Sequence, residues 1–180
     1  RILMPTLAAL ALCVAAPTEA TPAQAKFPPV SGKNLEGRKF NLPADFEGER
    51  NLVFVAFQRR QQDDIDVWMK NLGWVKKEPG LRVYEVPTLS RMNGITRSFI
   101  DRGMAAGIPS KEARESTITL YIDKGPFRKS LGIDTEETIY VLLVDRQGKV
   151  LWRAEGAFSQ AKLDSLKKKV LEKPAEPKKP

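Results

Sequence analysis

The chain has 180 residues, with 30 Lys or Arg against 22 Asp or Glu, and a formal net charge of +8. It contains no histidine, which excludes an imidazole base, a Ser-His-Asp triad and a His-ligated metal. Its single cysteine is Cys13, so an intramolecular disulfide and a dithiol redox pair are excluded as well.

The first residues have the pattern of a signal peptide. Arg1 supplies a positive charge, residues 7–16 form an apolar run, and residues 23–25 (AQA) fit a small-x-small cleavage site. Cleavage there removes Cys13 and leaves no thiol in the mature protein. We therefore expect a signal peptide over 1–25 and a periplasmic or secreted protein, with an uncleaved anchor as the alternative.

One domain is predicted over residues 26–171, and it begins with a turn-rich segment. Residues 26–50 contain a short hairpin across Glu36-Gly37, with Leu35, Phe40 and Leu42 in its arms. Residues 51–57 (NLVFVAF) are continuously apolar, which is typical of a central strand buried on both faces.

An amphipathic helix follows this strand. Three aspartates crowd its first turn, where the helix dipole favours negative charge: Asp63, Asp64 and Asp66. Its apolar face has three- and four-residue spacing and consists of Ile65, Trp68, Met69 and Leu72. Residues 81–86 alternate as a second strand, which we expect Pro87 to end.

The remaining elements are predicted from shorter patterns. They are an interrupted helical stretch over 88–116 with Ser110 as an N-cap, a strand over 117–122, a short helix over 127–131, and a strand hairpin over 139–144 and 150–153. A last helix is capped by Ser159, and its apolar face is Ala161, Leu163, Leu166 and Val170. Residues 172–180 contain only Pro, Lys, Glu and Ala, and we expect a disordered tail there.

This order of elements predicts an α/β sandwich. The opening of the domain, from Phe27 through Gly32-Lys33 and residues 40–42 (FNL) to NLVFVAF, resembles the thioredoxin-like superfamily, in its peroxiredoxin and thiol-disulfide oxidoreductase branch. Its close resembles the same branch from residues 121–123 (YID) through 131–133 (LGI) to YVLLVDRQGKVLW. The resemblance implies a central mixed sheet flanked by helices, here with a helical insertion over 87–116.

The chain departs from this branch where its chemistry takes place. The branch carries its reactive cysteine directly after the first core strand, and this chain has Gln58, Arg59, Arg60, Gln61 and Gln62 there. The branch also opens a later core strand with a cis-proline, where this chain has residues 137–139 (ETI). Because thiol exchange requires a thiolate, the branch's activity is not implied. The chain is also similar to thioredoxin-fold assembly factors of the mitochondrial ATP synthase membrane sector, which pair a Trp-bearing helix with a tail like VDRQGKVLWRAEG.

The polar cluster after the strand is the candidate site. Two arginines at a helix start favour binding of a carboxylate or phosphate, and α/β folds collect binding sites at this point. The alternative is that Arg59 and Arg60 form surface ion pairs with Asp63, Asp64 or Asp66. The three aspartates do not converge as metal ligands, so we expect no metal, and we expect no cofactor.

Two functions from different classes remain open. The first is a non-catalytic, redox-inactive module of the cell envelope that binds or assembles a protein partner through this cluster. The second is an enzyme or binding protein for a small anionic ligand at Arg59 and Arg60. A one-cysteine redox protein would need Cys13 to stay attached. No catalytic residue is assigned, the scattered charges predict no nucleic-acid partner, and the Lys-rich end, 167–179, favours either peripheral membrane contact or a solvated tail.

Overall fold

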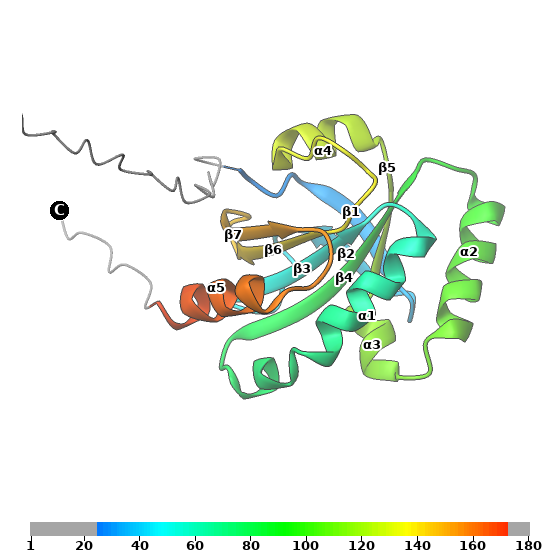
Figure 1. Ribbon diagram of the computed structural model, residues 1–180. Helices are drawn as coiled ribbons and strands as arrows, with labels where there is room; N and C mark the ends of the chain where they lie inside the picture. The colour runs from blue at the N-terminus through cyan, green and yellow to red at the C-terminus, as the bar shows by residue number, and fades with distance from the viewer. Residues whose placement is uncertain (1–24, 173–180) are drawn as a thin grey trace, which may run out of the picture.

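Seven strands form one mixed sheet with helices on both faces, in a computed structural model that describes residues 25–172 (Figure 1). The strand order is β2-β1-β5-β4-β3-β6-β7. The strands are β1 (Val30–Asn34), β2 (Lys39–Leu42), β3 (Arg50–Ala56), β4 (Leu81–Ser90), β5 (Ile118–Ile122), β6 (Tyr140–Asp145) and β7 (Val150–Glu155). The helices are α1 (Gln62–Lys70), α2 (Gly94–Gly107), α3 (Lys111–Ser116), α4 (Lys124–Leu131) and α5 (Gln160–Leu171), with 3-10 turns η1 (Arg59–Gln61) and η2 (Gly73–Lys77).

Within residues 25–172, the two longest apolar runs are neighbouring strands at the centre of this sheet. β3 pairs with β6 in antiparallel register, with Val53 opposite Leu142, and with β4 in parallel register, with Val53 opposite Tyr84. Consecutive side chains of a strand point to opposite faces, and both faces of β3 are covered. The predicted α/β thioredoxin-like sandwich with a central mixed sheet is confirmed.

One face of the sheet is covered by α1 and α5. Ile65 and Trp68 of α1 pack against Phe54, and Leu166 of α5 joins the same apolar cluster. Trp68 is fully buried, as predicted. Helix α5 begins where expected, because the Ser159 hydroxyl accepts a hydrogen bond from the backbone N–H of Lys162.

The opposite face is covered by α4 and by the segment that precedes β1. Phe27 is fully buried and meets Phe127 of α4 edge to face, with ring centroids 5.5 Å apart. The predicted β1–β2 hairpin is present, and it places Phe40 and Leu42 in this second core. Helix α4 ends at Gly132, whose positive φ of 61° suits glycine.

Helices α2 and α3 form the insertion. No residue of either helix is buried, and α2 lies at the rim of the molecule, beyond β5 (Figure 1). Ser110 caps α3 as predicted, since its hydroxyl accepts a hydrogen bond from the Ala113 N–H. Among the described residues, no helix is long and apolar enough to cross a bilayer.

Three details of the sequence prediction were wrong. Pro87 does not end its strand, because β3 pairs with β4 up to Pro87 and β5 pairs with it from Thr88 onward. Met69 is exposed, because it lies at the edge of the apolar stripe of α1, whereas Ile65, Trp68 and Leu72 reach the core. Ala161 is exposed on the first turn of α5, whereas Leu163, Leu166 and Val170 are buried.

Candidate functional site

The end of β3 forms a corner with the loop that precedes β6. Because Val55 lies opposite Tyr140, the residues that follow β3 meet residues 136–137 at the same edge of the sheet. We call this region the β3 corner and define it by residues 57–62 and 136–137. Four of the five predicted site residues form side-chain hydrogen bonds within this corner or to Asp66 of α1 and Glu85 of β4. They are Gln58, Arg60, Gln61 and Gln62.

Gln61 holds the two segments of the β3 corner together. Its side-chain oxygen accepts hydrogen bonds from the backbone N–H groups of Phe57 (2.8 Å) and Gln58 (3.2 Å). Its amide nitrogen donates to the backbone oxygen of Glu136 at 2.7 Å. Only 2% of Gln61 is exposed, so this residue is a structural tie and is not available to a ligand.

Arg60 and Gln58 bridge to Glu137 at the surface of the corner. The Arg60 Nη2 lies 2.5 Å from the Glu137 Oε2, and the Arg60 Nε donates to the Gln58 Oε1 at 2.7 Å. Gln58 in turn donates to the Glu137 Oε1 at 3.1 Å. The Arg60 and Glu137 side chains are 61% and 71% exposed, so this ion pair contributes little to stability.

Arg59 and Gln62 point to different surroundings. Arg59 is exposed, and no carboxylate of residues 25–172 lies within ion-pair distance of it. Gln62 donates to Asp66 at 3.0 Å and to Glu85 of β4 at 3.2 Å, away from Arg60. The predicted ion pairs of the two arginines with Asp63, Asp64 or Asp66 are therefore wrong, since Arg60 pairs with Glu137 across the corner.

Glu85 is a half-buried carboxylate that the sequence did not identify. Burial raises the pKa of Glu85, the nearby Asp66 raises it further, and the hydrogen bond from Gln62 lowers it. The alternating pattern of residues 81–86 suggested an ordinary solvent-facing position for it. The burial of Glu85 could not be predicted from the local pattern, because it results from α1 lying over this part of the sheet.

The described part of the chain contains neither cysteine nor histidine, and none of its Asp and Glu side chains gather in threes as a metal site. At the β3 corner the sequence places an amide, two guanidinium groups and a carboxylate in the places of the superfamily's thiol and cis-proline. The one cis peptide bond of the described residues is Leu42–Pro43, far from the corner in sequence. This chemistry suits recognition by hydrogen bonds and charge.

Comparison with solved structures supports the fold. A thioredoxin-like protein from Porphyromonas gingivalis is 18% identical, with a TM-score of 0.53, over 81% of this chain and 90% of its own. The structure titled BsSco, of the Sco family of cytochrome c oxidase assembly proteins, is 16% identical, with a TM-score of 0.56, over 84% and 97%. An exposed lipoprotein thioredoxin from Streptococcus pneumoniae is 14% identical, with a TM-score of 0.52, over 78% and 99%.

The sequence itself matches a family profile. No curated protein is similar enough to this chain to count as a match. The profile described as ATP10 protein matches residues 20–172, which include the β3 corner and the helical insertion. Both resemblances noted from the sequence, to the thioredoxin-like superfamily and to the ATP synthase assembly factors, are confirmed. The chain therefore belongs to the ATP10 protein family and has a thioredoxin-like fold.

Proposed function

We propose that this protein is a redox-inactive binding module that assists assembly of the membrane sector of an ATP synthase. The observation that carries the proposal is the family match over residues 20–172, joined to a corner that has lost its thiol. The family match supports the choice of partner, the membrane-sector subunits, which we call the client. The geometry of the β3 corner supports binding as the mode of action.

The chemistry of the corner supports binding in place of catalysis. Thiol–disulfide exchange requires an attacking thiolate, and neither the Gln58 amide nor the Arg60 guanidinium can supply one. The charge and the hydrogen-bond donors lie at the carboxyl end of a central strand, where α/β folds commonly bind ligands. Arginine is enriched in protein interfaces, because its planar donors bind carboxylates and backbone carbonyls.

Arg59 is the residue best placed for a first contact with a partner. It is exposed and has no ion-pair partner among the described residues, whereas Arg60 is held by Glu137. A partner carboxylate can bind Arg59 directly and can compete with Glu137 for Arg60. A small-anion site at Arg59 and Arg60 is less supported, because Arg60 already pairs with Glu137 and neither the cavity beside α2 nor the one lined by residues 75–82 includes residues of this corner.

The place of action is part of the same proposal. The signal-peptide pattern lies almost entirely outside the described residues and supports a cell-envelope location, in the periplasm or an equivalent compartment. Residues 173–179 of the Lys-rich end also lie outside the described part of the chain. Their charge supports peripheral contact with an anionic membrane, near the client.

Replacing both corner arginines tests the proposal. In cells that lack the endogenous protein, we expect ATP synthase assembly to fall and the wild-type chain to restore it. We expect Arg59→Ala/Arg60→Ala to fold normally but to capture membrane-sector subunits at least about tenfold less well, because a lost charge-assisted bond costs about 1.5–3 kcal/mol.

The matched control removes two positive charges elsewhere. Lys76 and Lys111 are 77% and 72% exposed, and each forms one exposed ion pair. We expect Lys76→Ala/Lys111→Ala to restore assembly like the wild-type chain. If the arginine variant captures the client and restores assembly at wild-type strength, the β3 corner is not the contact surface.

A further inference from the structure

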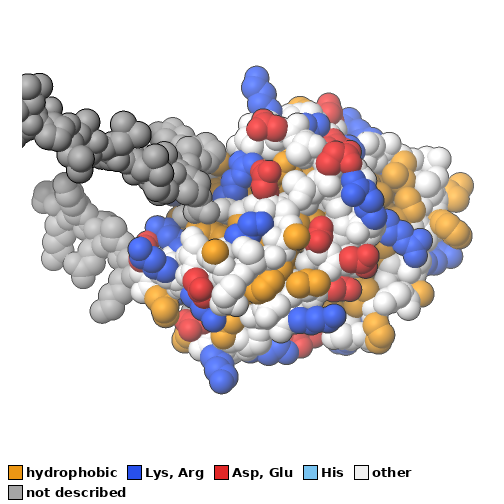
Figure 2. Space-filling view, viewed as in Figure 1, with side chains coloured by type: hydrophobic (Ala, Val, Ile, Leu, Met, Phe, Trp, Pro, Cys, Tyr) orange, Lys and Arg blue, Asp and Glu red, His pale blue; other side chains and the backbone are white. Residues whose placement is uncertain are grey.

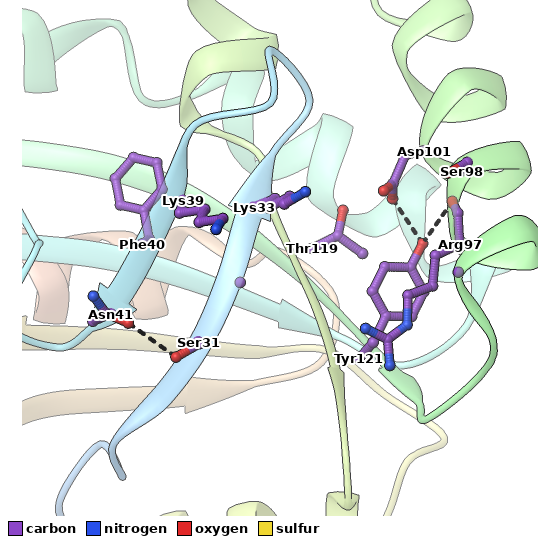
Figure 3. Close-up of a pocket in the computed structure, with 12 residues that line it drawn as sticks. Ser31, Lys33, Lys39, Phe40, Asn41, Arg97, Ser98, Asp101, Thr119 and Tyr121 are labelled. Atoms are coloured by element: carbon purple, nitrogen blue, oxygen red, sulfur yellow. Dashed lines mark hydrogen bonds between the residues drawn. The ribbon is translucent and has the colours of Figure 1, made fainter.

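A cavity of about 560 Å³ lies between α2 and the outer face of β2, β1 and β5. Alternate residues of these strands point into it, and Figure 3 shows Lys33, Thr119 and Tyr121 facing the space beside α2. Three of its side chains are cationic and one is anionic. They are Lys33, Lys39 and Arg97 against Asp101.

The two lysines are an unfavourable pair within the fold. Lys33 of β1 and Lys39 of β2 lie directly opposite each other in the antiparallel register, on the same face of the hairpin. Like charges in such a pair repel and destabilise the sheet. No Asp or Glu of residues 25–172 lies within 4.0 Å of either amino group to offset this repulsion.

Arg97 is held in position with its terminal nitrogens free. Its guanidinium lies over the ring of Tyr121, with 5.1 Å between its Cζ and the ring centroid, and its Nε donates to the backbone oxygen of Met92 at 2.8 Å. Neither Nη has an acceptor among the described residues. The Asp101 carboxylate does not lie within 4.0 Å of this guanidinium, and its Oδ1 accepts a hydrogen bond from the Tyr121 hydroxyl at 2.7 Å. That hydrogen bond adds to burial in raising the pKa of Tyr121.

A buried hydroxyl of the cavity also lacks a partner. Thr119 lies opposite Lys33 on β5 and is 2% exposed. Its Oγ1 makes no hydrogen bond within the described part of the chain. An unsatisfied buried hydroxyl costs free energy, so this hydroxyl, opposite Lys33 in the lining, is a second observation, independent of charge, that favours a hydrogen-bonding ligand in this cavity.

We propose that this cavity binds a phosphate group, carried by a free phosphate ester or by the headgroup of an acidic phospholipid. The excess of two positive charges suits an anionic phosphate group, and the free Arg97 nitrogens suit its oxygens. Gly94 adds the N-terminal end of α2 to the lining, where the helix dipole favours an anion. This inference does not rest on the assembly function, since the cavity is separate from the β3 corner.

The outer side of α2 distinguishes the two sources of phosphate. Ile95 and Phe99 are one helical turn apart and are 86% and 80% exposed, and Figure 2 shows hydrophobic side chains at the rim of the molecule where α2 lies. Neither residue lines the cavity. If the phosphate belongs to a lipid, these side chains contact the acyl region while the cavity holds the headgroup.

Phosphate titration of the purified protein tests the site without any partner. We expect inorganic phosphate to raise the melting temperature in a saturable way, beyond the effect of chloride at equal ionic strength. We expect Arg97→Gln, and the double variant Lys33→Gln/Lys39→Gln, to raise the half-saturating concentration at least about tenfold. The lysine variant should melt at the same or a higher temperature without phosphate, because the repulsive pair is gone.

Arg102→Gln is the matched control, because Arg102 is an exposed cation of α2 that does not line the cavity. Vesicles of phosphatidylcholine, with and without phosphatidylglycerol, identify the source. If the phosphate is a lipid headgroup, we expect the protein to bind the anionic vesicles. We then expect Phe99→Ser to weaken this vesicle binding without altering the phosphate titration. If the ligand is a free phosphate ester, we expect phosphate to raise the melting temperature, and we expect Phe99→Ser to change neither the phosphate titration nor the vesicle binding. If the cavity variants change neither phosphate nor vesicle binding, or Arg102→Gln weakens binding equally, the proposal is wrong.

Discussion

Trp68 provides a direct test of the core assignment. It is the largest fully buried side chain of the described residues, and it packs edge to face on Phe158, with ring centroids 5.3 Å apart, and near Phe54 at 6.1 Å. Its indole Nε1 donates to the backbone oxygen of Gly156 at 3.3 Å. Truncating such a residue to alanine costs about 3–5 kcal/mol. At about 2–4 °C per kcal/mol for a domain of this size, Trp68→Ala should lower the melting temperature by roughly 6–20 °C.

Thermal and urea unfolding, followed by circular dichroism, measure this effect. Trp68→Phe is the matched control, because it keeps an aromatic ring and loses the indole N–H and part of the volume, so its cost should be clearly smaller. Trp74→Ala is a second control, since Trp74 is only half-buried. A Trp68→Ala variant that loses less than about 1 kcal/mol would show that the α1 face does not pack as described.

Three other predictions concern chemistry, titration and processing. The purified mature protein should neither reduce insulin disulfides nor consume peroxide above the blank, because no cysteine follows Cys13; measurable turnover would refute this. Glu85→Gln should stabilise the protein at neutral pH and lose that advantage in acid. The raised pKa of Glu85 means that the folded state binds its proton more tightly, so wild-type stability falls as pH rises through that pKa, and a pH-independent difference in urea unfolding would contradict this. N-terminal sequencing from the native cell should find a start near Lys26, and a product that retains residues 8–16 would exclude cleavage.

The elements that the sequence predicted well are those with a strong local pattern. β3 and β6 follow from continuous apolar runs, since a strand buried on both faces needs apolar residues at every position. The starts of α3 and α5 follow from Ser110 and Ser159, which cap them. The end of α4 follows from Gly132.

The features that the sequence did not predict depend on contacts between distant segments. Pro87 remains in its strand because two neighbouring strands hold the chain on either side of it. Arg60 pairs with Glu137, which is 77 residues away, and not with the nearer aspartates. The cavity beneath α2 joins Lys33, Arg97 and Thr119 from three separate elements. Composition and periodicity do not reveal which distant segments of the chain come into contact.

Site-specific photocrosslinking at position 59 tests the central claim, that the β3 corner binds the client of assembly. A photoreactive residue in place of Arg59, introduced in cells that are assembling ATP synthase, should crosslink to a subunit of the membrane sector. The same residue in place of Lys149 should not, because Lys149 follows the turn after Asp145, at the far end of the sheet. Equal crosslinking from both positions, or none from position 59 while the protein still supports assembly, would contradict this account.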